Sequence, residues 1–252
     1  MANLSVNLNA VAQLRNRRNL PWPSVTRIAR ICLDAGADGI TVHPRPDERH
    51  IRRADVFELE TVMLDYPDRE FNIEGYPTEE FLRLCEAVGP DQVTLVPDDP
   101  AQGTSDHGWD IEANGTMLAE VIERLQNRHM RASLFINADP AVPRMAAEVG
   151  ADRVELYTGP YGQPGSDAIV ELAKLKATAD ACRTSGLRAA RGGAGLGVNA
   201  GHDLTLDNLI ALLKAIPDLD ETSIGHALTA DALIYGFAET VRRYREILTG
   251  QH

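Results

Sequence analysis

Histidine and glutamate side chains recur in this sequence within or directly after short runs rich in apolar and β-branched residues. The histidines are His43, His202 and His226, and the glutamates are Glu74 and Glu155. Histidine titrates near neutral pH, and burial beside other carboxylates raises the pKa of a glutamate, so both side chains suit proton transfer. Any one of the five could be purely structural, but a fold that gathers all of them would form an acid–base site.

A candidate phosphate site lies near the C-terminus. Gly225 and His226 follow an apolar run, and Thr229 and Asp231 then open the last expected helix. Helix N-termini bind phosphate through free backbone N–H groups, and glycine lets the backbone approach a ligand closely. Gly201, directly before His202, offers a similar approach. This pattern is typical of a phosphate cradle.

The elements that must position these residues alternate along the whole chain. Eight strand–helix units in 252 residues match the size of one (β/α)₈ TIM barrel. An open doubly wound sheet usually has fewer strands and a linker or second domain, and no Ser/Gly/Pro-rich linker occurs. We therefore expect residues 1–252 to form a single TIM-barrel domain with extra short helices. The expected strands are Leu4–Asn9, Gly39–Arg45, Glu70–Tyr76, Gln92–Asp98, Arg131–Asn137, Arg153–Gly159, Gly195–His202 and Glu221–Ala227, and the expected helices are Ser24–Ala37, Ala54–Tyr66, Thr78–Val88, Thr116–Arg128, Ala141–Val149, Ser166–Ser185, Thr205–Ile216 and Thr229–Thr249.

In a barrel of this kind, polar residues at the carboxyl ends of the strands form the active site. Two segments exceed a minimal barrel: Pro100–Asn114 leaves a strand on this catalytic face, and Leu187–Ala194 enters a strand on the opposite face, where we expect oligomer contacts. The polar or glycine positions expected at the catalytic face are Asn7, Asn9, His43, Arg45, Glu74, Asp98, Asn137, Asp139, Glu155, Tyr157, Asn199, His202, Gly225 and His226.

Charge and composition exclude several classes of function. The formal net charge is −12 with no basic tail, which argues against nucleic acid as a partner. The chain begins without a signal-peptide pattern, and no apolar run approaches the ~18 residues of a membrane span, so we expect a cytoplasmic protein with no membrane partner. Cys32, Cys85 and Cys182 form no C-x-x-C pair and fall in expected helices, which predicts burial.

Lysine occurs only at Lys174, Lys176 and Lys214, all in expected helices. A Schiff-base aldolase needs a buried lysine at a strand end, so that chemistry is excluded. The sequence also lacks a P-loop. The G-x-G-x-x-A pattern at Gly195–Ala200 leads into a strand instead of opening a helix, which argues against a dinucleotide site there.

A metal site is the main alternative to a metal-free acid–base site. The histidines and glutamates named above are acceptable ligands for zinc or iron. However, the first strand lacks the H-x-H pair of metal-dependent barrel hydrolases, and H-E-x-x-H is absent. We therefore expect no metal and no other cofactor, and keep a metal-dependent epimerase or lyase as the alternative.

Several short motifs resemble those of the pyridoxine 5′-phosphate synthase family, and the resemblance runs through all eight units. They are Ser5-Val6-Asn7, Gly39-Ile40-Thr41-Val42-His43-Pro44-Arg45, Arg49-His50-Ile51, Asn72-Ile73-Glu74, Val198-Asn199-Ala200-Gly201-His202 and Ile224-Gly225-His226-Ala227.

This resemblance implies a metal-free condensation of 1-deoxy-D-xylulose 5-phosphate with 3-amino-2-oxopropyl phosphate, with release of phosphate and water. It also implies a ring of subunits, a homo-octamer. By resemblance, His43 and Glu74 are proton acceptors, His202 is a proton donor and Glu155 stabilises the transition state. The resemblance further implies contacts to the deoxyxylulose phosphate from Arg45, His50 and Thr104, and contacts to the amino-ketone phosphate from Asn7, Arg18, Gly225 and His226.

The sequence departs from the family pattern at three places. Asn9 and Ala10 stand where the family commonly has Asp-His, Asp203 stands where a glycine is common, and Leu187–Ala194 is longer than expected. Asn9 and Asp203 are retained as candidate substrate-binding positions. The Asn9-Ala10 pair also motivates a third hypothesis, a non-catalytic paralogue that binds phosphorylated metabolites. The retained His43, Glu74 and His202 favour an active enzyme.

Overall fold

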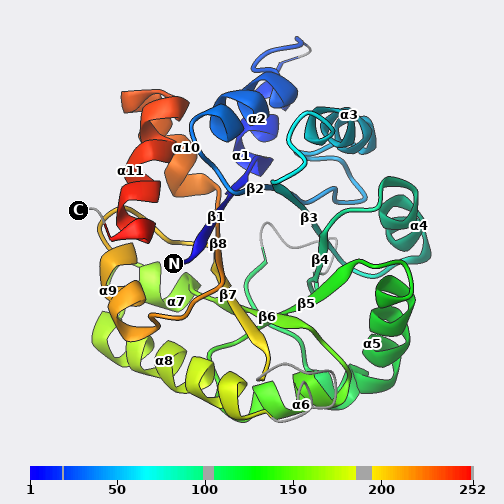
Figure 1. Ribbon diagram of the computed structural model, residues 1–252, viewed down its shortest axis with the longest axis vertical. Helices are drawn as coiled ribbons and strands as arrows, with labels where there is room; N and C mark the ends of the chain where they lie inside the picture. Colours follow the sequence, from blue (N-terminus) through cyan, green and yellow to red (C-terminus); the bar gives the residue numbers. More distant parts are fainter. Residues whose placement is uncertain (19, 99–104, 186–194, 251–252) are drawn as a thin grey trace.

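A computed structural model describes residues 1–18, 20–98, 105–185 and 195–250. Its eight parallel strands pair in sequence order, and β1 closes the barrel by pairing with β8 (Figure 1). The expected TIM barrel is therefore confirmed. The strands are β1 Asn3–Asn7, β2 Gly39–Val42, β3 Glu70–Gly75, β4 Gln92–Leu95, β5 Arg131–Ile136, β6 Arg153–Tyr157, β7 Gly197–Gly201 and β8 Glu221–Ile224.

The helices form an outer ring around these strands (Figure 1). Side chains accept backbone hydrogen bonds at the starts of four of them: Ser24, Thr78, Asp110 and Asp167. The helices within the described residues are α1 Asn9–Asn16, α2 Val25–Asp34, α3 Arg53–Met63, α4 Glu79–Val88, α5 Ile111–Gln126, α6 Val142–Glu148, α7 Gly159–Gly162, α8 Ala168–Thr184, α9 Leu209–Ala215, α10 His226–Tyr235 and α11 Phe237–Thr249.

Successive side chains of a strand point to opposite faces, so one set packs against the outer helices and the other lies inside the barrel. In β1, Leu4 and Val6 are buried against the surrounding helices, whereas Ser5 belongs to a polar barrel interior. Ser5 Oγ and Thr41 Oγ1 are 2.6 Å apart, and Asn72 Nδ2 donates to Thr41 Oγ1 at 3.3 Å. Thr94 Oγ1 then donates to Asn72 Oδ1 at 3.1 Å. Small polar residues thus fill the interior below the carboxyl ends of the strands.

Several expected boundaries were wrong at the carboxyl ends of the strands. Asn9 was placed in the first strand, but it is the first residue of α1. His226 was placed in the last strand, but it is the first residue of α10, with Gly225 as the N-cap. At these points the chain leaves the sheet and turns across the barrel mouth, so an apolar run alone does not mark where pairing stops.

Two expected segments also differ. The single helix Thr229–Thr249 is two helices, because Gly236 has φ +78° and ends α10 before α11 begins. The helix expected from Thr116 begins at Ile111, so the end of the long segment Pro100–Asn114 is helical. Leu187–Ala194 and Thr104 lie outside the described residues. Cys32, Cys85 and Cys182 are buried, as predicted.

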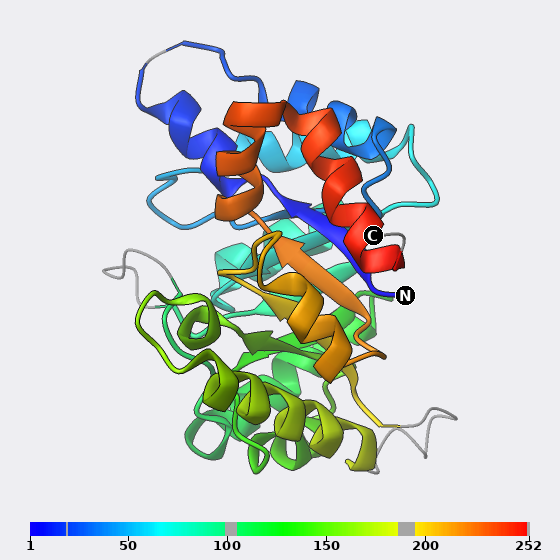
Figure 2. The ribbon, with the colours of Figure 1, turned by 90° about the vertical axis from the view of Figure 1, so that its left-hand side faces the viewer.

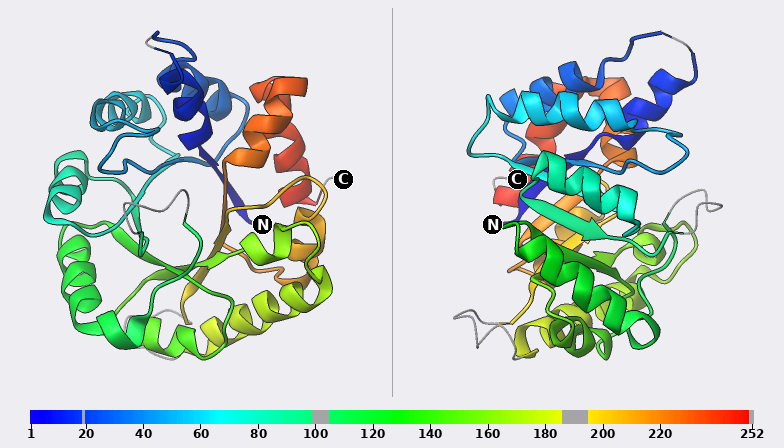
Figure 3. Two further views of the ribbon diagram at one scale, coloured as in Figure 1. Left: turned by 180° about the vertical axis from the view of Figure 1, so that it is seen from behind. Right: turned by 90° about the vertical axis from the view of Figure 1, so that its right-hand side faces the viewer.

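The side views separate the two faces of the barrel. Helices α1 and α10 lie on the side toward which the strand arrows point, while the N-terminus lies on the opposite side near α11 (Figures 2 and 3). Helix α11 packs against α2 and β1. Within the described residues, no helix has the length and apolar character needed to cross a membrane.

Candidate active site

A cavity of about 480 Å³ opens at the carboxyl ends of the strands. This volume is within the ordinary range for small-molecule sites. Its lining includes residues from β1 and α1, from the ends of β2 and β3, and from β5 to β8. The lining residues are Asn7, Asn9, Ala10, Gln13, His43, Arg45, His50, Glu74, Val96, Ser105, Phe135, Glu155, His202, Asp203, Ser223, Gly225 and His226. All five of the histidines and glutamates that we expected to gather are present.

Glu74 is held by neighbours from the first and last strands. Asn7 Nδ2 donates to Glu74 Oε2 at 3.3 Å, and Ser223 Oγ lies 3.5 Å from Glu74 Oε1. Burial, followed by the charges of Asp98 and Glu221, raises the pKa of Glu74 to about 8. This carboxyl group can therefore hold or release a proton near neutral pH.

Glu155 lies deeper, on β6, and is almost fully buried. Burial, with the nearby charges of Glu74 and Glu221, raises the pKa of Glu155 well above its usual range. Its Oε2 atom has no hydrogen-bond partner among the described residues. The protonated form of the Glu155 carboxyl group is therefore favoured, and its Oε2 is a buried polar atom that the described residues leave without a partner.

His43 is fixed at the end of β2 by its backbone and by its ring. Its N–H donates to Asn9 Oδ1 at 2.9 Å. The His43 ring meets the His50 ring edge-on, with ring centres 5.9 Å apart. Burial, followed by the positive charge of Arg45, lowers the pKa of His43 well below its usual value, and the same two causes lower the pKa of His50 to about 4. The neutral form of both imidazoles is therefore favoured, which leaves a lone pair on each ring.

His202 follows β7 with φ +95°, an uncommon backbone conformation for a residue other than glycine. Its ring stands perpendicular to that of Tyr157, with centres 5.0 Å apart. Its Nδ1 atom is 3.2 Å from Asp203 Oδ2, and this contact lowers the pKa of Asp203. Strained residues held by their surroundings are frequent at functional sites. The Asp203 carboxylate thus faces the His202 ring, a contact that a glycine at this position could not make.

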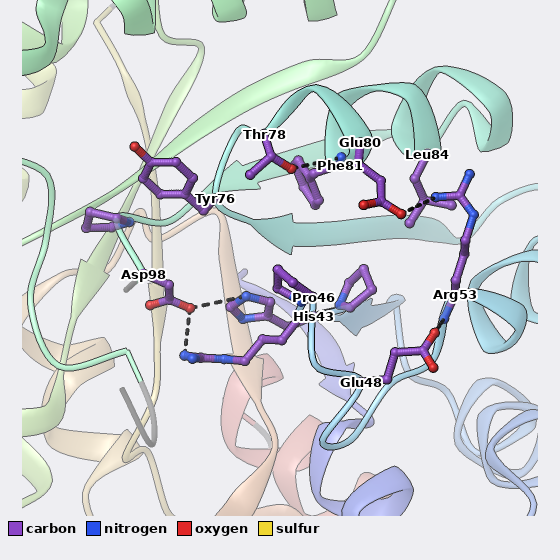
Figure 4. Close-up of a pocket in the computed structure, with 13 residues that line it drawn as sticks. His43, Pro46, Glu48, Arg53, Tyr76, Thr78, Glu80, Phe81, Leu84 and Asp98 are labelled. Atoms are coloured by element: carbon purple, nitrogen blue, oxygen red, sulfur yellow. Dashed lines mark hydrogen bonds and ion pairs between the residues drawn. The ribbon is translucent and has the colours of Figure 1, made fainter. Parts of the chain in front are cut away.

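Arg45 and Asp98 form a buried ion pair beside His43. Arg45 Nη2 donates to Asp98 Oδ2 at 2.7 Å, and His43 Nε2 lies 3.2 Å from the same oxygen. These three residues also border a neighbouring cavity of about 570 Å³, which Tyr76, Phe81 and other side chains complete (Figure 4).

The structure places the start of helix α10 where the sequence predicts a phosphate site. Gly225 caps α10, so the first N–H groups of that helix are at the edge of the cavity. A Cβ atom on Gly225 would lie 3.1 Å from Asn7 Cβ, so a side chain there would crowd Asn7. His226 is exposed at the same edge.

Some expected positions lie elsewhere. Arg18 is exposed and does not line the cavity, so its substrate contact stays a prediction. Asn199 lies inside the barrel, where its Nδ2 donates to Glu221 Oε1 at 3.3 Å. Asn137 Oδ1 accepts from the Gly108 N–H at 2.9 Å, a structural contact.

Sequence reasoning assigned no role to Asp98 or Ser223, although Asp98 was placed at a strand end. The signal for Ser223 is the two-residue alternation of β8, which puts Glu221 and Ser223 on one side of the strand. Within residues 1–18, 20–98, 105–185 and 195–250, no group of three or more His, Cys, Asp or Glu side chains is arranged to hold a metal ion.

Fold and cavity together define a TIM-barrel enzyme whose site contains buried carboxyl groups and imidazoles. The chain belongs to the family described as "Pyridoxal phosphate biosynthesis protein PdxJ", which matches residues 4–250.

The chain is also similar to curated and solved proteins over nearly its whole length. It is 60% identical over 247 residues to "Pyridoxine 5′-phosphate synthase" of Chelativorans sp., covering 96% of each chain. It is 58% identical over 247 residues to the protein of the same name in Mesorhizobium japonicum, covering 96% of this chain and 97% of that one. A crystal structure of 3-hexulose-6-phosphate synthase from Salmonella typhimurium shares the fold, with a TM-score of 0.65, 15% identity, and coverage of 99% of this chain and 100% of that one.

Proposed function

We propose that this chain is a pyridoxine 5′-phosphate synthase that condenses 1-deoxy-D-xylulose 5-phosphate with 3-amino-2-oxopropyl phosphate. Pyridoxine 5′-phosphate, inorganic phosphate and water are the products. The family and the relatives at 56–60% identity support this activity. The main structural support is that Glu74 and His43 line the same cavity. The pKa of Glu74 is raised and that of His43 is lowered, so one side chain favours its protonated form and the other its unprotonated form.

The charge states of the site suit a condensation with several proton transfers. The amine that forms the imine comes from a substrate, so the enzyme needs no lysine of its own. A neutral His43 can accept the proton lost from a carbon or amine, and Glu74 can take up or release a proton near neutral pH. His202 is the group that we assign to donate a proton to a departing hydroxyl group. Glu155 lies deepest, so we assign it to the stabilisation of charge within the transition state.

Two phosphate groups need two anion sites. At one side of the cavity, Arg45 offers a guanidinium group held by Asp98, and guanidinium binds phosphate through paired N–H donors. At the other side, the N-terminus of α10 offers backbone N–H groups beside Asn7. We therefore assign the deoxyxylulose phosphate to the Arg45 side and the amino-ketone phosphate to Gly225 and His226.

The test is a discontinuous assay of the purified protein with both substrates, in the presence of a metal chelator. We expect equal amounts of pyridoxine 5′-phosphate and inorganic phosphate. A folded protein that yields neither product, while the His43→Asn variant behaves identically, would overturn the proposal. Activity that disappears with chelator and returns with zinc or iron would favour the metal-dependent alternative.

Assembly into a homo-octamer is part of the same proposal. Helix α1 packs on α10, and both carry strongly exposed apolar side chains: Leu14 is 51% exposed, Leu233 76% and Ile234 74%. Exposed apolar groups of this size favour contact with another subunit. Light scattering should give about 220 kDa, eight times the chain mass of 27.5 kDa. The double variant Leu233→Asp/Ile234→Asp should reduce this mass. The cytoplasmic location expected from the sequence is also proposed here, and cell fractionation tests it.

A further inference from the structure

Asp98 follows β4 and reaches His43 from the side of the neighbouring cavity (Figure 4). It is 7% exposed, and its Oδ2 atom is 3.2 Å from His43 Nε2. Asp98 lines the cavity of about 570 Å³ but not the cavity of about 480 Å³ that holds Glu74 and Glu155. It is therefore placed to act on His43 without being part of the substrate-facing wall.

The contact has a chemical consequence, because an ionised carboxylate can only accept hydrogen bonds. Arg45 donates to the same oxygen at 2.7 Å and favours the ionised form, although burial raises the pKa of Asp98. A proton on His43 Nε2 faces this carboxylate, whereas a lone pair on Nε2 would be repelled by its negative charge, so the Nε2–H tautomer is favoured. Its other nitrogen, Nδ1, keeps a lone pair, and this atom is 3.9 Å from Glu74 Oε2.

We propose that Asp98 is a positioning residue that holds His43 in the Nε2–H tautomer, so that Nδ1 is the proton-accepting atom next to Glu74. The carboxylate also stabilises the imidazolium that forms when Nδ1 takes a proton. The kinetic part of this inference rests on the proposed function. The tautomer itself is a property of the free protein and needs no turnover.

The first experiment measures the tautomer directly by ¹⁵N NMR of histidine-labelled protein. The His43 signals are assigned by their loss in His43→Gln. We expect the Nε2–H form in the wild type and in Asp98→Glu, which keeps a carboxylate, and loss of that preference in Asp98→Ala. A wild-type His43 in the Nδ1–H form, or an unchanged tautomer in a folded Asp98→Ala, would overturn the proposal.

The second experiment separates positioning from substrate binding. Asp98→Asn keeps the size and an acceptor atom but removes the charge. We expect kcat to fall about 10²-fold, the scale of acid–base catalysis, with KM values changed less than about threefold. The acid limb of the kcat profile should move to lower pH, because the carboxylate no longer favours the imidazolium.

Asp68→Asn is the matched control, an exposed aspartate between α3 and β3 that should leave kcat and its pH profile unchanged. A higher KM with an unchanged kcat in Asp98→Asn would show that Asp98 acts only through Arg45, and would refute the positioning role. If the wild type makes no product at all, the proposed function fails, while the NMR result still decides the tautomer.

Discussion

Gly201 lies directly against Glu155: a Cβ atom built on Gly201 would be 2.2 Å from Glu155 Oε1. The backbone of β7 therefore forms one wall of the space in which the Glu155 carboxyl group sits. Because β6 and β7 pair side by side, neither strand can move away without breaking the barrel. The absence of a side chain at Gly201 is thus part of how Glu155 is positioned.

The variant Gly201→Ala should displace Glu155 and lower kcat by about 10²-fold or more, with a loss of about 1–3 kcal/mol in the free energy of unfolding. Steady-state kinetics and urea denaturation measure the two effects. Gly115→Ala in α5 is the control, because its Cβ would meet only Val149 Cγ1 at 3.6 Å, an ordinary contact. Equal behaviour of the two variants would contradict the steric role of Gly201.

Replacing Glu74 by glutamine should separate chemistry from binding. The amide keeps the size of the side chain and its place beside Asn7, but it cannot transfer a proton. We expect kcat to fall about 10²-fold or more while substrate affinity, measured by calorimetry, changes little. Unchanged turnover would remove Glu74 from the mechanism.

The same substitution should change how stability depends on pH. In the folded protein the pKa of Glu74 is about 8, above the value of 4.5 for a free glutamate. Glu74 therefore contributes to the free energy of unfolding at low pH, and this contribution is lost as the pH rises through 8. Between pH 6.5 and 8.5, the free energy of unfolding should fall by about 2 kcal/mol more in the wild type than in Glu74→Gln. Urea denaturation at several pH values measures this difference, and parallel curves would show that the folded pKa is not raised.

Asn9 supports His43 through the backbone, since its Oδ1 atom accepts from the His43 N–H. Asn9→Ala leaves that donor without its partner, and should cost about 1–3 kcal/mol of stability and reduce kcat. Asn9→Asp keeps an acceptor in the same place and should retain the stability of the wild type. Equal stability of all three proteins, measured by thermal unfolding, would show that the hydrogen bond contributes nothing.

The sequence by itself determined the barrel, because eight strand–helix repeats in a chain of this length have few other ways to bury their apolar faces. It also determined that His43, Glu74, Glu155 and His202 share one cavity, since parallel strands bring their carboxyl ends to the same face. Both conclusions depend on the hydrophobic periodicity of each segment and on the parallel direction of the strands, and the order of residues along the chain indicates both.

Only the tertiary structure decided which atoms meet. The contact of Asp98 with His43 joins residues far apart in the sequence that follow β4 and β2, strands that are not neighbours in the barrel. The raised pKa of Glu74 likewise arises from burial and from the charges of Asp98 and Glu221, residues distant in sequence. Desolvation and charge interactions depend on distances through space, and spacing along the chain does not contain those distances.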